Sequence, residues 1–191
     1  MTSITGTLAH PEYTELGISI IAGGIFGMLG DIYLDQKWVY PQHDEKYLFA
    51  GFSCFGIGHL IFIAGMLNQI EFVAKDFIVP AIVSVVVTVG QLILEKPTKQ
   101  KFGKFKGILI VYCLILAFAM GVSFMAAYKT GYTGFIVYAI GLVFFLISDI
   151  ILSPMYFAIA KDKNTPVNFV LNHATYYIAQ FMIAFSISLL P

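Results

Sequence analysis

The chain has 191 residues, of which 59% are hydrophobic and only 12% are charged, whereas about a quarter of the residues of an ordinary soluble domain are charged. Equal numbers of basic and acidic residues give a formal net charge of zero. This balance argues against a nucleic-acid partner, which would need excess positive charge. The composition therefore predicts an integral membrane protein without a separate soluble domain.

Apolar stretches separated by charge, Pro, Asn or Gly predict six membrane-spanning helices, because crossing a hydrocarbon core of about 30 Å takes about 20 residues. The stretches cover residues 15–34, 46–67, 77–94, 107–127, 132–157 and 170–190. We expect an all-α, multi-pass bundle that forms one domain over residues 1–191 and lies in the plasma membrane. The first stretch has no preceding Lys or Arg and no small-residue cleavage site, so it is expected to remain as a helix.

The distribution of lysines predicts how the bundle is oriented. All eleven basic residues are lysines, and Lys75 and Lys129 alone lie on one side. The other nine follow the first, third and fifth stretches: Lys37, Lys46, Lys96, Lys99, Lys101, Lys104, Lys106, Lys161 and Lys163. Because positive charge is retained in the cytoplasm, both termini are expected outside the cytosol. The run KPTKQKFGKFK is either an ordinary cytoplasmic loop or a site for anionic lipid head groups.

Asp31 lies toward the inner end of the first stretch. A charged Asp at the bilayer centre costs about 2.5 to 3.5 kcal/mol, so such a residue usually faces protein or a cavity. Gly23, Gly27, Asp31 and Asp35 recur at four-residue steps and therefore share one face of a helix. Small residues on that face let another helix approach closely. We predict that Asp31 points into the bundle.

The second and fifth stretches repeat this spacing with His59 and Asp149. The repeated residues are Gly51, Phe55 and His59 in the second stretch and Gly141, Phe145 and Asp149 in the fifth. Asp31 and Asp149 lie at similar depth, about 25 Å from the outer end at 1.5 Å per residue. Two neighbouring buried carboxyl groups can divide proton donation and acceptance between them. We predict that these three residues form a catalytic site, although each could instead only bridge helices.

The last stretch carries further polar side chains on a narrow arc. They are Asn172, His173, Tyr176, Tyr177 and Gln180. Hydrogen bonding between helices is the ordinary role of such residues in a membrane bundle. We predict in addition that they orient the acids or bind a polar substrate head group.

No sequence motif for a metal, a nucleotide or a nucleophilic serine occurs in the chain. Cys54 and Cys113 lie within predicted helices and are interpreted as small hydrophobic residues. We predict no cofactor. A zinc site formed by Asp31, His59, Asp149 and His173 is the open alternative, because membrane helices can bring distant ligands together without a spacing signature.

Four blocks of sequence resemble the YhhN family of membrane proteins, which includes lysoplasmalogenase. These blocks are GDIYL, FAGFSCFGIGHLIF, GLVFFLISDIIL and TYYIAQFMIA. They occur in the family's order and cover four of the predicted helices, whereas residues 68–127 resemble the family only in hydropathy.

The resemblance implies hydrolysis of the vinyl-ether bond of a lysoplasmalogen or related lysolipid within the membrane. This chemistry needs one acid and one base, and we assign these roles to Asp31 and Asp149 without distinguishing them. His59 would orient a carboxylate or the water, and Tyr177 and Gln180 would hold the substrate.

Three alternatives stay open at this point. The buried acids could form a proton relay in a small transporter, a metal-bound water could hydrolyse another lysolipid, or the chain could be a structural partner. The sequence does not indicate an oligomeric state.

Overall fold

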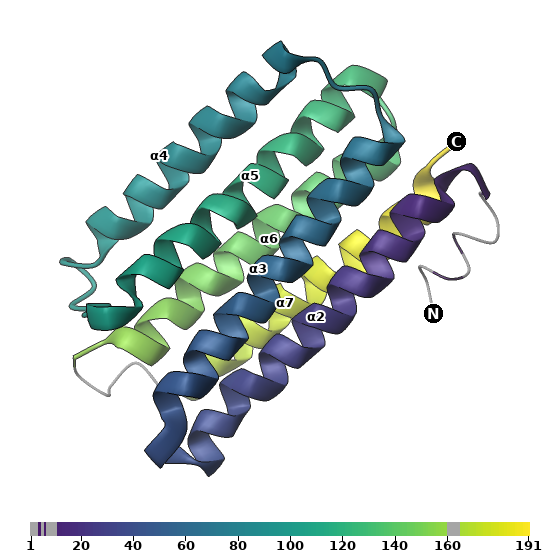
Figure 1. Cartoon of the computed structure of the whole chain (residues 1–191). Coiled ribbons are helices and arrows are strands. Elements are labelled where there is room, and N and C mark those ends of the chain that lie inside the picture. Colours follow the sequence, from purple (N-terminus) through teal and green to yellow (C-terminus); the bar gives the residue numbers. More distant parts are fainter. Residues whose placement is uncertain (1–3, 5, 7–10, 160–164) are drawn as a thin grey trace.

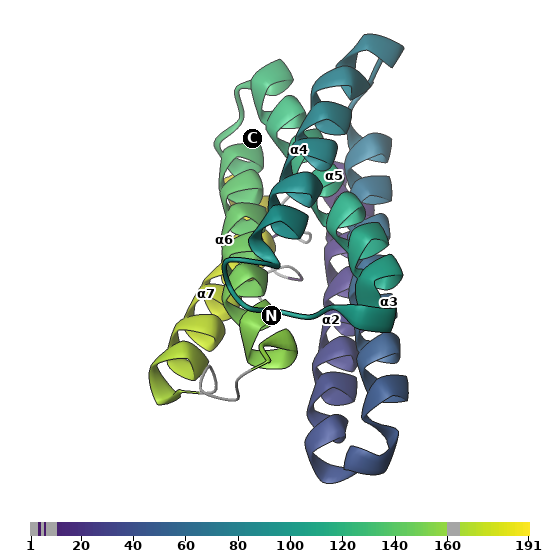
Figure 2. The same ribbon diagram turned by 90° about the vertical axis from the view of Figure 1, so that its left-hand side faces the viewer.

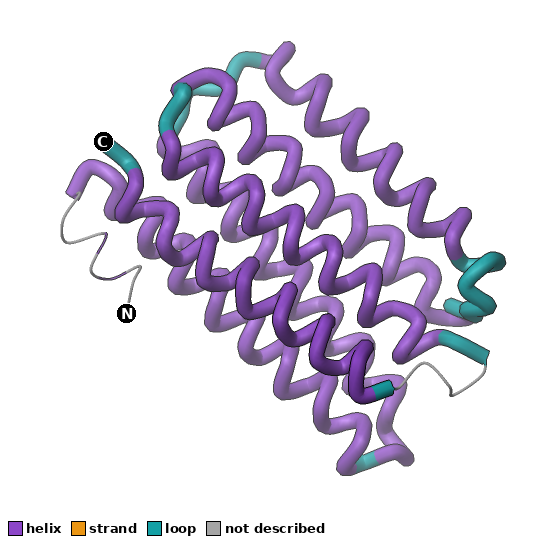
Figure 3. Tube along the Cα trace, turned by 180° about the vertical axis from the view of Figure 1, so that it is seen from behind, coloured by secondary structure: helices purple, strands orange, loops and turns teal. Residues whose placement is uncertain are grey.

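The computed structural model describes residues 4, 6, 11–159 and 165–191, which form a bundle of long helices (Figure 1). These are α2 (Thr14–Val39), α3 (Asp44–Gln69), α4 (Ile78–Leu94), α5 (Lys106–Thr130), α6 (Thr133–Phe157) and α7 (Pro166–Phe185). Short 3-10 helices adjoin them: η1 (Pro11–Tyr13), η2 (Pro41–His43), η3 (Ala74–Phe77), η4 (Gly103–Phe105) and η6 (Ser186–Leu189). Apart from one isolated bridge, the described residues are helix or loop (Figure 3). The predicted all-α fold is confirmed.

Each of the six predicted stretches corresponds to one long helix. Within the described residues, the five helical segments containing α2 to α6 are long and apolar enough to cross a membrane, so the chain is an integral membrane protein. The remaining helix, α7, has 20 residues and carries the predicted arc of polar side chains.

Hydropathy located the helices better than it located their ends. α2 continues to Val39, beyond the predicted end at residue 34, because polar residues extend a helix past its apolar part. α7 begins at Pro166 rather than at residue 170. The Thr165 hydroxyl oxygen accepts a hydrogen bond from the Asn168 backbone N–H (3.1 Å), and Pro is favoured at the first helical position.

The loops that carry most of the lysines meet at one end of the bundle. The Lys101 backbone N–H donates to the Phe157 carbonyl oxygen at the end of α6 (2.8 Å), and Lys104 forms an ion pair with Glu45 at the start of α3. This common end agrees with the grouping used to predict orientation, and the orientation itself stays a prediction. Two of the counted lysines lie outside the described residues: Lys161 and Lys163.

Glu95 holds the loop between α4 and α5 at this end. Its carboxylate accepts hydrogen bonds from Lys106 Nζ (2.9 Å) and from the Phe102 backbone N–H (3.2 Å). The bond from Lys106 is the larger cause, and together they lower the pKa of Glu95 from its usual value of 4.5. Because the native pKa is depressed, this stabilisation is present above pH 4.5 and is lost as the pH falls through the native pKa.

Replacing Glu95 with Gln is expected to lower the Tm slightly at neutral pH, since exposed ion pairs contribute at most about 1 kcal/mol. It should also reduce the fall of the Tm on acidification below about pH 5, because the group that gains the proton is absent. Thermal unfolding in detergent across this pH range measures both effects. Glu71→Gln, beyond the other end of α3, is the matched control, and an equal change in both variants would contradict the prediction.

The helices pack as three antiparallel pairs, α2 with α3, α4 with α5 and α6 with α7. α5 lies centrally and also contacts α3 and α6. α4 is outermost, whereas α2 and α7 approach one another with only sparse contact (Figures 1 and 2). The two pairs α2–α3 and α6–α7 therefore leave a seam between them.

Glycines bring the paired helices close together. A Cβ at Gly23 of α2 would lie against the Phe62 ring and 2.9 Å from the Gly58 carbonyl oxygen of α3. Between α6 and α7, a Cβ at Gly141 would lie 3.1 Å from the Ala179 carbonyl oxygen. These faces contact protein, as the four-residue spacing predicted.

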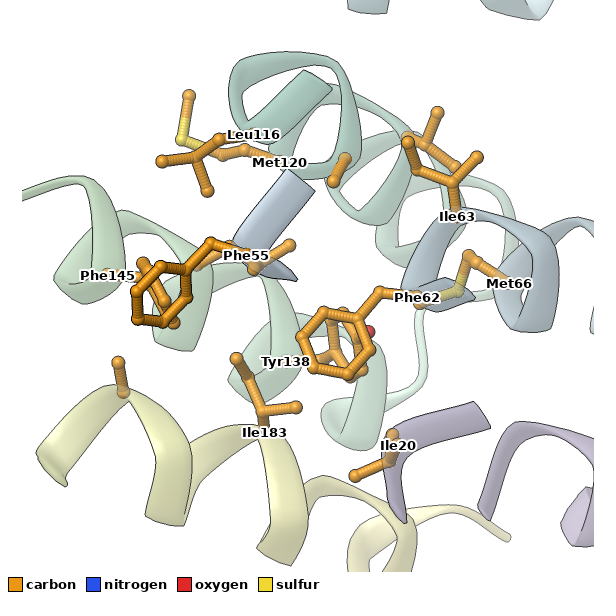
Figure 4. Close-up of a cluster of buried hydrophobic side chains, with 14 of the residues drawn as sticks. Ile20, Phe55, Phe62, Ile63, Met66, Leu116, Met120, Tyr138, Phe145 and Ile183 are labelled. Carbon is orange, nitrogen blue, oxygen red and sulfur yellow. The ribbon is translucent and has the colours of Figure 1, made fainter. Parts of the chain in front are cut away.

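The apolar core lies where these pairs meet (Figure 4). Phe55 and Phe62 from α3 face Phe145 and Tyr138 from α6, and Ile183 from α7 completes this part of the core. Phe55 and Phe145 are in edge-to-face contact, with ring centroids 6.0 Å apart. This aromatic layer forms part of the wall of the candidate site.

Candidate active site

Asp31 joins α2 to α7 across the seam. Asp31 Oδ2 accepts a hydrogen bond from the Tyr176 hydroxyl (2.7 Å), and the Gln180 side chain hydrogen-bonds Tyr176 in turn. Gly27 lies one turn from Asp31, and a Cβ there would be 3.6 Å from the Tyr176 hydroxyl. The predicted inward direction of Asp31 is confirmed.

Asp149 forms the equivalent pair between α6 and α5. Its Oδ2 accepts a hydrogen bond from the Tyr112 hydroxyl (2.5 Å), and Tyr112 is buried beneath Phe52 and Phe55. Each aspartate therefore has a tyrosine from a neighbouring helix that restricts the direction of its carboxylate.

Both aspartates line one polar cavity, which has a volume of about 130 Å³ and lies between α2, α3, α6 and α7. Aromatic and aliphatic side chains form most of its remaining wall. The further polar residues that line it are Asp35, Ser148, Asn172 and His173. Toward the lysine-bearing end it adjoins a wider pocket of about 510 Å³, with which it shares residues of α2, α6 and α7. The predicted meeting of Asp31 and Asp149 is thus present in the fold.

The predicted residues of α7 divide into different positions. Asn172 is buried and donates from Nδ2 to the Ser148 carbonyl oxygen (2.9 Å) and hydroxyl (2.8 Å), so its amide fastens α7 to α6. His173 and Tyr177 lie at the rim, and the Tyr177 side chain is 63% exposed. Gln180 contacts the site through Tyr176.

His59 lies behind the site, outside the set of residues that lines the polar cavity. It is buried in α3, and its Nδ1 is 2.7 Å from the Phe55 carbonyl oxygen. Its ring packs edge-on against Tyr112, with centroids 5.9 Å apart. Its Nε2 is buried without a hydrogen-bond partner among the described residues. His59 can therefore influence Asp149 through Tyr112.

Sequence reasoning missed Tyr112, which binds Asp149, and Tyr156, which lines the cavity. Both are aromatic residues in apolar stretches, so their hydropathy did not separate them from core residues. The available signal for Tyr112 was its hydroxyl at membrane depth, which needs a partner when buried.

Among the described residues, no group of three or more His, Cys, Asp or Glu side chains is placed to hold a metal ion. The four residues considered for zinc are accordingly not assembled as a ligand set in this fold. His59 in particular is separated from the polar cavity by the aromatic layer.

Fold and site together define a polytopic helical membrane protein with two tyrosine-bound carboxylates facing one internal cavity. The YhhN family model matches residues 2–187, so the chain belongs to the YhhN family. The resemblance drawn from four sequence blocks is confirmed over nearly the whole chain. No match to the chain was found among curated proteins or among solved structures.

Proposed function

We propose that this protein is a membrane-embedded hydrolase that cleaves the vinyl-ether bond of a lysoplasmalogen, giving a fatty aldehyde and a glycerophospho-base. The observation that carries the proposal is the placement of Asp31 and Asp149, from different helices, in one cavity. The family membership of the chain is consistent with this activity.

The reaction can proceed with two carboxyl groups. Protonation of the vinyl carbon farther from the ether oxygen gives an oxocarbenium ion, and water then attacks the carbon bonded to oxygen. The resulting hemiacetal collapses to the aldehyde and the free glycerol hydroxyl. One aspartic acid donates the first proton and the other aspartate accepts a proton from water, as in glycoside hydrolysis.

The surrounding residues support these roles by fixing geometry. Tyr176 and Tyr112 each donate a hydrogen bond to one carboxylate. Each bond fixes the direction in which that carboxylate faces the substrate or the attacking water. Asn172 keeps α7 against α6 beside Asp149. In this proposal His173 and Tyr177, which line the cavity, contact the polar head group.

The seam between α2 and α7 is the proposed opening for the head-group side of the substrate and for water. Contact between these helices is sparse, and Asp31 and Tyr176 face one another across it. A single-chain lipid could enter sideways from the membrane, with its head group toward the lysine-bearing end. The membrane that surrounds the protein therefore also supplies the substrate.

The test is incubation of the purified protein in detergent with a lysoplasmenyl lipid, followed by measurement of fatty aldehyde. In D₂O, the aldehyde should carry one deuterium on the carbon next to the carbonyl, because the proton is delivered to that carbon. The matched saturated ether lysolipid has no vinyl carbon to protonate and should not be cleaved.

Two results would contradict the proposal. One is the absence of aldehyde from folded protein. The other is loss of activity on treatment with a chelator and recovery with zinc, which would favour a metal-bound water.

A further inference from the structure

A second, apolar cavity lies on the other side of Asp149, between α4, α5 and α6. It has a volume of about 50 Å³, and its wall is formed mainly by aliphatic and aromatic side chains that include Leu92, Leu116 and Leu146, together with Cys113. Asp149 lines both this cavity and the polar cavity. The carboxylate therefore lies at the boundary between an apolar space and a polar one.

The apolar cavity reaches the membrane-facing surface. Ile150 lines it and is 42% exposed. α4 and α6 both pack on α5 but make little contact with one another, and α5 lies between them (Figure 1). A space this narrow admits the first carbons of one hydrocarbon chain, and the rest of that chain can extend past the exposed Ile150 into the bilayer.

We propose, resting on the proposed function, that the apolar cavity binds the start of the substrate's hydrocarbon chain while the polar cavity binds its glycerophosphate side. Leu152 and Tyr156 line both cavities together with Asp149, which makes the two spaces neighbours around one carboxylate. The substrate class is accordingly a lipid with a single chain, because two chains would need a wider space at this boundary.

This placement distinguishes the two acids. The vinyl carbon that receives the proton is on the chain side of the bond, and Asp149 is the aspartate that borders the apolar cavity. Asp149 donates its proton to that carbon, and Asp31 accepts a proton from the attacking water. When the hemiacetal collapses, Asp31 returns this proton to the glycerol oxygen and Asp149 recovers one from the hemiacetal hydroxyl, so one water is consumed.

The binding experiment uses a saturated, non-cleavable ether lysophospholipid with a photoreactive diazirine near the start of its chain. Illumination followed by mass spectrometry should give adducts on residues of the apolar cavity, such as Leu92, Cys113 and Leu146. Adducts confined to α2 and α7 would overturn the proposal. Because this probe reports binding without hydrolysis, its result is independent of whether the protein cleaves a vinyl ether.

A pair of variants on α5 tests the same site by activity. Cys113→Phe places a ring in the cavity and is expected to reduce both adduct formation and kcat/KM for the lysoplasmenyl lipid at least tenfold. Val111→Phe adds a ring on the exposed side of the same helix and should leave both unchanged. Equal effects of the two substitutions on folded protein would overturn the proposal, and the adduct map of the unmodified chain decides the matter if Cys113→Phe does not fold.

Discussion

Replacing Asp149 with Asn is expected to lower aldehyde release from a lysoplasmenyl lipid by about 10²- to 10⁴-fold, the usual contribution of a positioned acid or base. Asn retains the side-chain shape and an oxygen that can accept the Tyr112 hydrogen bond, but it cannot protonate carbon. The residual rate should rise as the pH falls, because hydronium then supplies the proton. Measurement of kcat/KM against pH tests both statements.

Asp31→Asn removes the proposed base and is expected to reduce the rate by about 10²-fold, the lower part of that range, because water attack then lacks a positioned base. The matched control is Asp44→Asn, because Asp44 is exposed at the start of α3 and should tolerate the change. Thermal unfolding of each variant establishes that it is folded. Full aldehyde release by folded Asp149→Asn or Asp31→Asn would contradict the paired-acid mechanism.

The inward positions of Asp31 and Asp149 could be predicted because two signals can be read from the local sequence. One is the free-energy cost of a charged side chain in lipid, and the other is the spacing of each aspartate from glycine in steps of four residues. A four-residue step indicates which residues share a helix face, and the insertion cost of a charge indicates that this face avoids lipid. Neither argument needs knowledge of the neighbouring helix.

The partners of these residues could not be predicted in this way, because they depend on which helices are neighbours. Tyr112 reaches Asp149 only because α5 lies centrally, against both α3 and α6. His59 shares the spacing of the two aspartates, yet the aromatic layer separates it from the polar cavity. Tyr176 and Tyr177 are adjacent in sequence, but Tyr176 binds Asp31 whereas Tyr177 is largely exposed.

Replacing Gly23 with Ala is expected to destabilise the bundle by about 1–3 kcal/mol, the usual cost of forcing extra atoms into a packed interior. The added Cβ would lie 2.9 Å from the Gly58 carbonyl oxygen, and backbone atoms cannot move aside as a flexible side chain can. α2 and α3 would have to separate. Equilibrium unfolding in detergent measures the change.

Gly24→Ala is the matched control, because it makes the same chemical change one residue along the same helix. Its Cβ would meet no atom within 4 Å, so it is expected to stabilise the helix by about 0.5–1 kcal/mol through the lower backbone freedom of Ala. Destabilisation of the same size in both variants would contradict the close-packing argument. Because Phe55 of α3 and Asp31 of α2 line the same cavity, separation of the two helices by Gly23→Ala should also lower hydrolysis, whereas Gly24→Ala should preserve it.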